Sequence, residues 1–169
     1  HNGDVGSFDT LFYRHYDRVY GLLFRLVGNR AEAEELTQEV FLKLYQQNFR
    51  RGQEHNLSGW LYRVATNAGY NAIRGRKRRW RRDTMLLPDP TDVPPSPSER
   101  MAQQETRRAV RNALAKLTER QGQLLLLRQM GMSYDELATA CEVAPGSVGT
   151  LLRRAAEAFR KVYREEAGE

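Results

Sequence analysis

The sequence has few of the residues that metal sites, disulfides and membrane spans require. It holds one cysteine, Cys141, and three histidines in 169 residues, too few and too scattered for an internal disulfide or a zinc cluster. No run approaches the roughly 18 apolar residues of a membrane span, and no signal peptide is visible at the start. We therefore expect a soluble, cytoplasmic protein with no membrane insertion and no metal or other cofactor.

Positive charge is confined to one segment. The formal net charge is +6, and "RGRKRRWRR", residues 74 to 82, alone contributes +7, which leaves −1 for the rest. A localised basic patch favours binding to polyanions, because each Lys or Arg near a phosphate releases condensed counterions. A solvated tail or a targeting signal would also explain this segment taken alone.

Proline is scarce outside another segment, since five of the six prolines lie within residues 83–100. Proline removes a backbone donor and biases its neighbour toward extended conformations, so we predict that no helix crosses this segment. The segment is also acidic. It predicts a linker, 83–100, between two domains, 1–82 and 101–169.

Both flanks show helical periodicity and no alternating strand pattern, which predicts an all-α protein of two small helical domains. In the N-terminal domain, a helix capped by Ser7 ends at Gly28-Asn29, and two more follow. The apolar positions of those two helices are Ala33, Leu36, Val40, Leu44 and Leu61, Val64, Ala65, Ala68, Ala72. Four helices are predicted after the linker, divided near Thr118, Gly131 and Ala144.

The second helix has an unusual polar face. Opposite its apolar positions it carries Glu35, Gln38, Glu39, Leu42 and Gln46. A leucine framed by Gln and Glu suits docking to a partner helix, although single exposed leucines are common in proteins.

The third helix carries a mixed face suited to nucleic acid. Basic side chains supply phosphate affinity, aromatic rings stack on unpaired bases, and Asn pairs with base edges. The face opposite its apolar positions presents Arg63, Asn67, Tyr70, Arg74 and Lys77, flanked by Trp60, Asn71 and Arg78. A targeting signal would not explain this ordered face.

The segment "YDELATACEVAPGSVGTLL", residues 134 to 152, has the pattern of a helix-turn-helix. Ala138 is small where the second helix crosses, and Pro145 suits the first turn of that helix. The positions expected to pack the two helices, with Cys141 as a packing residue, are Leu137, Cys141, Val143, Val148 and Leu151.

Together these features resemble a bacterial RNA polymerase sigma factor of the extracytoplasmic-function (ECF) type. Three blocks match in the family's order: "AEELTQEVFLKLY", "GWLYRVATNAGYNAIRGRKRR" and the helix-turn-helix. The resemblance implies a promoter-specificity subunit with no enzymatic activity of its own, and no paired carboxylates, metal cluster or phosphate-binding loop argues otherwise. It implies as partners the core polymerase, through its largest-subunit coiled coil and flap, promoter DNA, and an anti-sigma factor. We expect a monomer outside these complexes.

The resemblance also assigns roles to residues. Leu36, Gln38, Glu39, Phe41 and Leu42 would bind the coiled coil. The third helix, with a preceding loop at 48–57, would melt the −10 element through Trp60, Arg63, Asn67, Tyr70, Asn71, Arg74, Lys77 and Arg78. The −35 element would be contacted by Arg128, Ser147, Thr150, Arg153 and Arg154. The acidic linker would occupy the enzyme's nucleic-acid channel.

Three positions depart from the family pattern. Glu142 stands where many members have glycine, Gly149 where many have a basic residue, and Leu151 where many have arginine. These departures leave base reading at −35 open. Two other interpretations remain: a DNA-binding regulator that uses only the helix-turn-helix, and a sigma-like decoy that titrates an anti-sigma factor.

Overall fold

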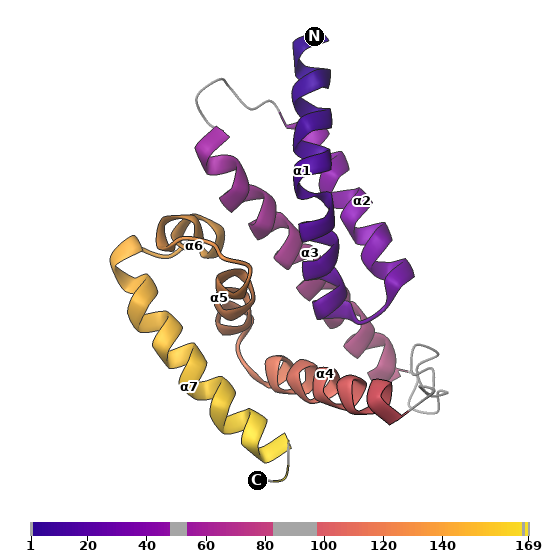
Figure 1. Ribbon diagram of the computed structural model, residues 1–169, viewed down its shortest axis with the longest axis vertical. Coiled ribbons are helices and arrows are strands. Elements are labelled where there is room, and N and C mark those ends of the chain that lie inside the picture. Colours follow the sequence, from indigo (N-terminus) through magenta and orange to yellow (C-terminus); the bar gives the residue numbers. More distant parts are fainter. Residues whose placement is uncertain (1, 48–53, 83–97, 167, 169) are drawn as a thin grey trace. The chain divides into compact units, whose positions relative to one another are not determined.

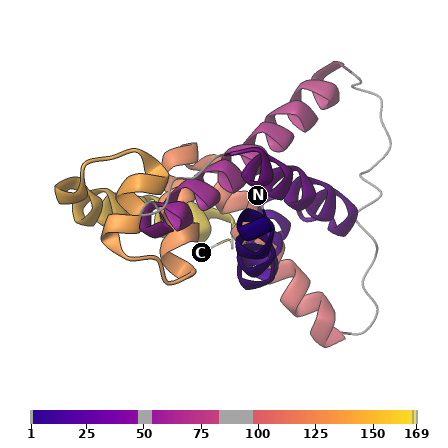
Figure 2. The same ribbon diagram turned by 90° about the horizontal axis from the view of Figure 1, so that it is seen from above.

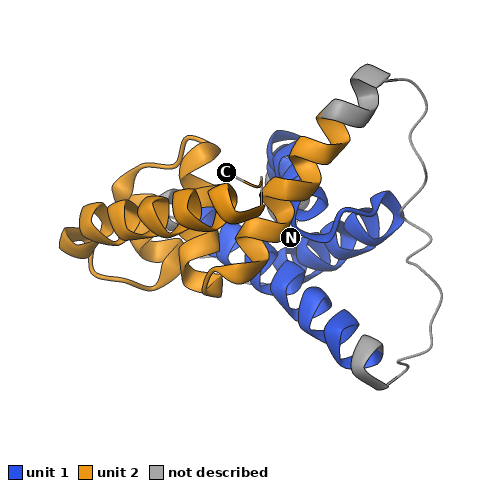
Figure 3. Cartoon of the chain, turned by 90° about the horizontal axis from the view of Figure 1, so that it is seen from below, with its two compact units in different colours: residues 1–82 blue, residues 83–169 orange. Residues whose placement is uncertain are grey.

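The chain folds into helices that form two compact units, residues 1–82 and 83–169 (Figures 1 and 3). The computed structural model describes residues 2–47, 54–82, 98–166 and 168. Within these ranges there are helices and turns and no strand, so the all-α prediction is confirmed. None of the helices in these ranges is long and apolar enough to cross a membrane.

Unit 1 is a bundle of three helices, α1 (Asn2–Val27), α2 (Arg30–Gln46) and α3 (Glu54–Arg82), and each packs on the other two (Figure 2). Its core is built from Leu22 and Leu23 of α1, Val40 of α2, and Leu61 and Tyr62 of α3, all almost completely buried. A Cβ on Gly69 would lie 2.6 Å from Cδ1 of Leu26. The missing side chain therefore lets α3 approach α1 closely.

Helix α1 ends where the sequence predicts but begins earlier than predicted. α1 ends at Val27, Gly28 has a φ of 72°, and Asn29 caps α2 by accepting the Glu32 backbone N–H at 2.9 Å. The predicted cap of α1 is wrong, because Ser7 lies inside the helix, which begins at Asn2. Serine has only a modestly lower helix propensity than alanine, so it does not end a helix that packing stabilises.

Unit 2 contains α4 (Ser98–Lys116), α5 (Glu119–Gln129), α6 (Tyr134–Cys141), a 3₁₀ turn η1 (Pro145–Ser147) and α7 (Val148–Glu166). The predicted breaks hold: Thr118 forms a capping box at α5, Gly131 has a φ of 87°, and Ala144 precedes the 3₁₀ turn. Residues 83–97 of the predicted linker lie outside the described residues. The linker was predicted to reach residue 100, whereas α4 begins at Ser98, directly after Pro97.

The helix-turn-helix of α6, η1 and α7 is held by a buried apolar layer. Leu137 and Val148 are completely buried, and Cys141 is nearly so, which confirms its role in packing. The buried Gln123 Nε2 donates to the Ala140 carbonyl at 3.3 Å and so satisfies one of the last carbonyls of α6. Glu142 adopts the left-handed conformation with φ 56° and ψ 48°. This region disfavours residues that have a Cβ.

Candidate polymerase and nucleic-acid interfaces

The polar face of α2 is exposed, as the sequence predicts. Leu42 is 57% exposed, although it is a leucine, and Gln38 and Glu39 beside it are also exposed. Leu36 is half-buried at the edge of this polar face. An apolar side chain inside a polar surround has the composition of a contact point for another protein.

Phe41 does not belong to this surface. Its side chain is 2% exposed, and its ring lies 5.0 Å from that of Phe12 and 5.9 Å from that of Tyr16, both in α1. The reason is that α2 packs on two helices and buries both Val40 and Phe41, a wider stripe than the predicted one. In its place the surface gains Tyr45, which is 61% exposed and one turn after Leu42. The i, i+3 spacing from Leu42 is the sequence signal that places Tyr45 on this surface.

Tyr70 is the second wrong assignment, because it is only 8% exposed and so cannot stack on a base. The stripe of α3 that faces the core includes Tyr62, Thr66 and Gly69, which were not counted as core residues from the sequence. The buried stripe is therefore rotated from the predicted one and reaches Tyr70. On its other side, Val64 and Ala68, predicted as core, are only half-buried.

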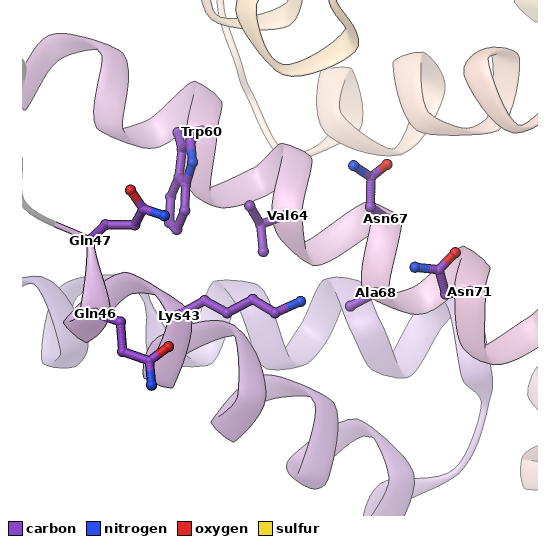
Figure 4. Close-up of a pocket in the computed structure, with 8 residues that line it drawn as sticks. All are labelled: Lys43, Gln46, Gln47, Trp60, Val64, Asn67, Ala68 and Asn71. Carbon is purple, nitrogen blue, oxygen red and sulfur yellow. The ribbon is translucent and has the colours of Figure 1, made fainter.

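The rotation opens a groove of about 420 Å³ between the end of α2 and the middle of α3 (Figure 4). Val64 and Ala68 form an apolar wall, and the remaining lining residues are Lys43, Gln46, Gln47, Trp60, Asn67 and Asn71. Figure 4 shows Trp60 and the two glutamines at one end, the two asparagines at the other, and the Lys43 side chain running between them. Three predicted residues, Trp60, Asn67 and Asn71, thus meet in one cavity. Lys43 and Gln46 of α2 and Gln47 just after it were not predicted to line such a cavity.

The basic run continues α3 as a helix, but its cations are not equivalent. Arg76 donates to the Val27 carbonyl at 3.2 Å and forms an ion pair with Glu32. It therefore joins the end of α3 to the turn between α1 and α2. The predicted residues Arg74, Lys77 and Arg78 are exposed.

Arg63 and Arg74 occupy different surroundings. Arg63 is half-buried. Arg74 is exposed and donates to the Asn71 carboxamide oxygen, which fixes the amide at the end of the groove. Residues 48–53 of the predicted melting loop lie outside the described residues, and the loop is shorter than predicted because α3 begins at Glu54.

Five predicted DNA contacts in unit 2 are exposed: Arg128, Ser147, Thr150, Arg153 and Arg154. Arg128 is held in place, since it donates to the Met132 carbonyl at 2.8 Å and its guanidinium lies 5.1 Å from the centre of the Tyr134 ring. Leu151 is half-buried, and a Cβ on Gly149 would lie 3.6 Å from Cε2 of Tyr134. The partly exposed Tyr134 ring therefore lies beside the bare backbone of Gly149, which the sequence did not predict.

Neither unit offers a metal centre within the described residues, where no group of three or more His, Cys, Asp and Glu side chains could hold an ion. Burial raises the pKa of the Cys141 thiol to about 12, so the thiol remains protonated at neutral pH.

Comparison with known proteins agrees in both units. Residues 11–79 match the family model of sigma-70 region 2, and residues 107–159 match that of sigma-70 region 4. The chain is 31% identical to the RNA polymerase sigma-H factor of Pseudomonas aeruginosa, covering 94% of this chain and 87% of that protein. It is 32% identical to the ECF RNA polymerase sigma factor SigE of Mycolicibacterium smegmatis, covering 96% of this chain and 64% of that protein.

A solved structure shares the fold. It is that of the sigma factor RpoE in complex with the anti-sigma factor NepR from Bartonella quintana, with a TM-score of 0.66 at 21% identity over 94% of this chain and 97% of that one. Since both units match sigma-70 regions and the sequence matches are ECF and other RNA polymerase sigma factors along most of the chain, the chain belongs to the ECF group of the sigma-70 family of RNA polymerase sigma factors.

Proposed function

We propose that the chain binds core RNA polymerase through α2, captures an unpaired promoter base in the groove between α2 and α3, and contacts upstream DNA through α7. The coarse function, promoter-specific initiation of transcription, follows from the family. The groove supports the finer assignment, because it joins an indole ring, an apolar wall and two carboxamides within one cavity beside a basic helix.

The groove has the chemistry of a site for a single base. The Trp60 indole and the half-buried Val64 and Ala68 offer apolar surface to the face of a base, and Asn67 and Asn71 offer hydrogen bonds to its edge. A base in a duplex is stacked and paired, so it must leave the helix to enter such a cavity. Each stacking contact stabilises the opened strand by on the order of 1–3 kcal/mol.

The exposed cations of α3 would hold the backbone on either side of that base. Arg74, Lys77 and Arg78 extend from the amide end of the groove along the helix. Phosphate contacts of this kind supply affinity and position the DNA, and they leave base choice to the groove.

The polymerase surface is Leu42 with Gln38, Glu39 and Tyr45. The expected partner is the coiled coil of the largest core subunit, with the flap as the partner of unit 2. An anti-sigma factor is a further partner, in line with the complex of the B. quintana protein. Leu42 is the anchor that we expect to lose water on binding.

The test adds the purified chain to bacterial core polymerase with genomic fragments as template and maps the transcript starts. Starts that appear only with the chain and share upstream elements support the proposal. Binding of core without any new start would contradict promoter opening and favour the decoy. Failure to bind core would contradict the role of α2 and favour a regulator that uses only the helix-turn-helix.

A further inference from the structure

Lys43 lines the groove, although the sequence pattern did not predict a role for this cation. It lies on α2 next to Leu42, yet it lines the groove, whereas Leu42 belongs to the polymerase surface. Figure 4 shows its side chain lying along the groove, with the ammonium directed toward the end formed by Asn67 and Asn71. Among the residues that the structure describes, the ammonium has no ion-pair partner.

The amide end of the groove is rich in hydrogen-bond donors. A lysine ammonium has three donors and no acceptor. The Asn71 carboxamide oxygen already accepts from Arg74, which leaves it one lone pair, and its NH₂ group adds two donors. Asn67 adds one NH₂ group and one carboxamide oxygen, so the donors at this end still outnumber the acceptors.

Donors in excess favour one kind of base edge. Guanine and thymine present keto oxygens, whereas adenine has no keto oxygen and presents an exocyclic amino group. At the position where guanine and thymine present a keto oxygen, adenine presents an amino group, so the ammonium would face another donor instead of an acceptor.

We propose that Lys43 is a specificity-determining residue that donates to a keto oxygen of the captured base and discriminates against adenine. This inference rests on the proposed capture of an unpaired base. α2 then serves two ligands from adjacent positions: Leu42 contacts the polymerase, and Lys43 contacts the DNA.

A contact to a backbone phosphate is the competing role for this lysine, and the groove favours the base. The ammonium lies between the apolar wall of Val64 and Ala68 and the two carboxamides, which is a surround for a planar ring. A phosphate contact would serve all sequences equally, whereas a keto contact acts at one position only.

The experiment uses complete holoenzyme and single-stranded oligonucleotides from one of the mapped promoters. Each unpaired position is replaced in turn by adenine, and competition binding gives the loss in affinity. At the keto position thus found, the keto oxygen is removed together with the adjacent ring N–H, with 2-aminopurine in place of guanine or 5-methyl-2-pyrimidinone in place of thymine. We expect wild type to lose about tenfold or more at this position, as for a hydrogen bond to a charged group.

The variants are Lys43→Met, which keeps the length of the side chain, and Lys43→Arg, which keeps its charge. Lys43→Met is expected to reduce the penalty at this one position to less than about threefold, while Lys43→Arg retains most of it. Arg30→Met is the matched control, since Arg30 is an exposed cation at the other end of α2. It should retain the full penalty, and core binding should be the same for all variants.

The outcomes separate the two proposals. Lys43→Met that keeps the wild-type penalty overturns the role of Lys43 alone. The role of Lys43 is also overturned if Lys43→Met weakens the binding of all oligonucleotides equally and lowers the salt dependence of binding by about one phosphate contact. A contact to the DNA backbone would behave in this way. If wild-type holoenzyme shows no base preference at any unpaired position, base capture fails, and the inference falls with it.

Discussion

Two glycines of unit 2 should respond in opposite directions to the same substitution. Gly149 lies in the first turn of α7, where a Cβ would meet Tyr134 at 3.6 Å, an ordinary contact distance. Gly131 has a φ of 87° and nothing within 4 Å of an added Cβ. Gly149→Ala therefore tests helix propensity with a new contact, and Gly131→Ala tests backbone strain alone.

The expected magnitudes follow from the two backbones. Gly149→Ala should raise the free energy of unfolding of unit 2 by about 0.5–1 kcal/mol, because alanine loses less conformational entropy in a helix. Gly131→Ala should lower it by about 1–2 kcal/mol, the strain of a left-handed residue with a Cβ. For a domain of this size the two changes move the Tm by several degrees in opposite directions.

The full-length chain allows the two units to be measured separately. Both tryptophans, Trp60 and Trp80, lie in unit 1, so tryptophan fluorescence during urea unfolding reports unit 1 and should not change. Amide hydrogen exchange of α5 and α7 reports unit 2. Destabilisation by both variants would refute the helical placement of Gly149 beside Tyr134, and a neutral Gly131→Ala would refute the left-handed turn.

Three further predictions concern other parts of the chain. Leu42→Asp should weaken binding to core polymerase at least tenfold without changing the thermal unfolding, as expected for an exposed anchor in a pull-down titration. Arg76→Met should destabilise unit 1 by about 1 kcal/mol in urea unfolding, because it loses Glu32 and the Val27 carbonyl, whereas exposed Arg79→Met should be nearly neutral. The pKa of Cys141 is raised in the fold to about 12 from 9.0, so its contribution to stability is complete below pH 9 and falls as the pH rises toward 12. Cys141→Ala should remove that part of the pH dependence. In unfolding measured from pH 8 to about 11, the free energy of unfolding of the variant should therefore fall less steeply with pH than that of the wild type.

The sequence predicts the helices of this protein better than it predicts which faces they bury. Breaks at Gly28, Thr118 and Gly131 follow from local backbone chemistry, and the structure has them there. The wrong assignments, Phe41 and Tyr70, both lie on helices that pack against two neighbours. Counting apolar residues gives one stripe for each helix, whereas two contacts bury a wider one.

The residues that line the groove show again that counting apolar residues does not give the buried face of a helix. Val64 and Ala68 are apolar and fall on helical spacing with Leu61, so the sequence places them in the core. The positions that fill the core instead include Thr66 and Gly69, whose small or polar side chains carry no apolar signal. Lys43 gives no signal for the groove either, because only packing brings α2 beside this part of α3.

The departures in the helix-turn-helix have a common structural consequence. Leu151 is half-buried, and Gly149 has the Tyr134 ring beside it, so neither can extend a polar side chain toward a base. Arg153 and Arg154 are exposed one turn further along α7, while Tyr134 with the Arg128 guanidinium forms a fixed surface at its start. Under the proposed contact of α7 with the −35 element, hydrogen bonding to bases would be left to Ser147, Thr150 and the two arginines. A helix with these two early positions closed would distinguish fewer bases directly, and the proposed function would then give more of the promoter choice to the groove of unit 1.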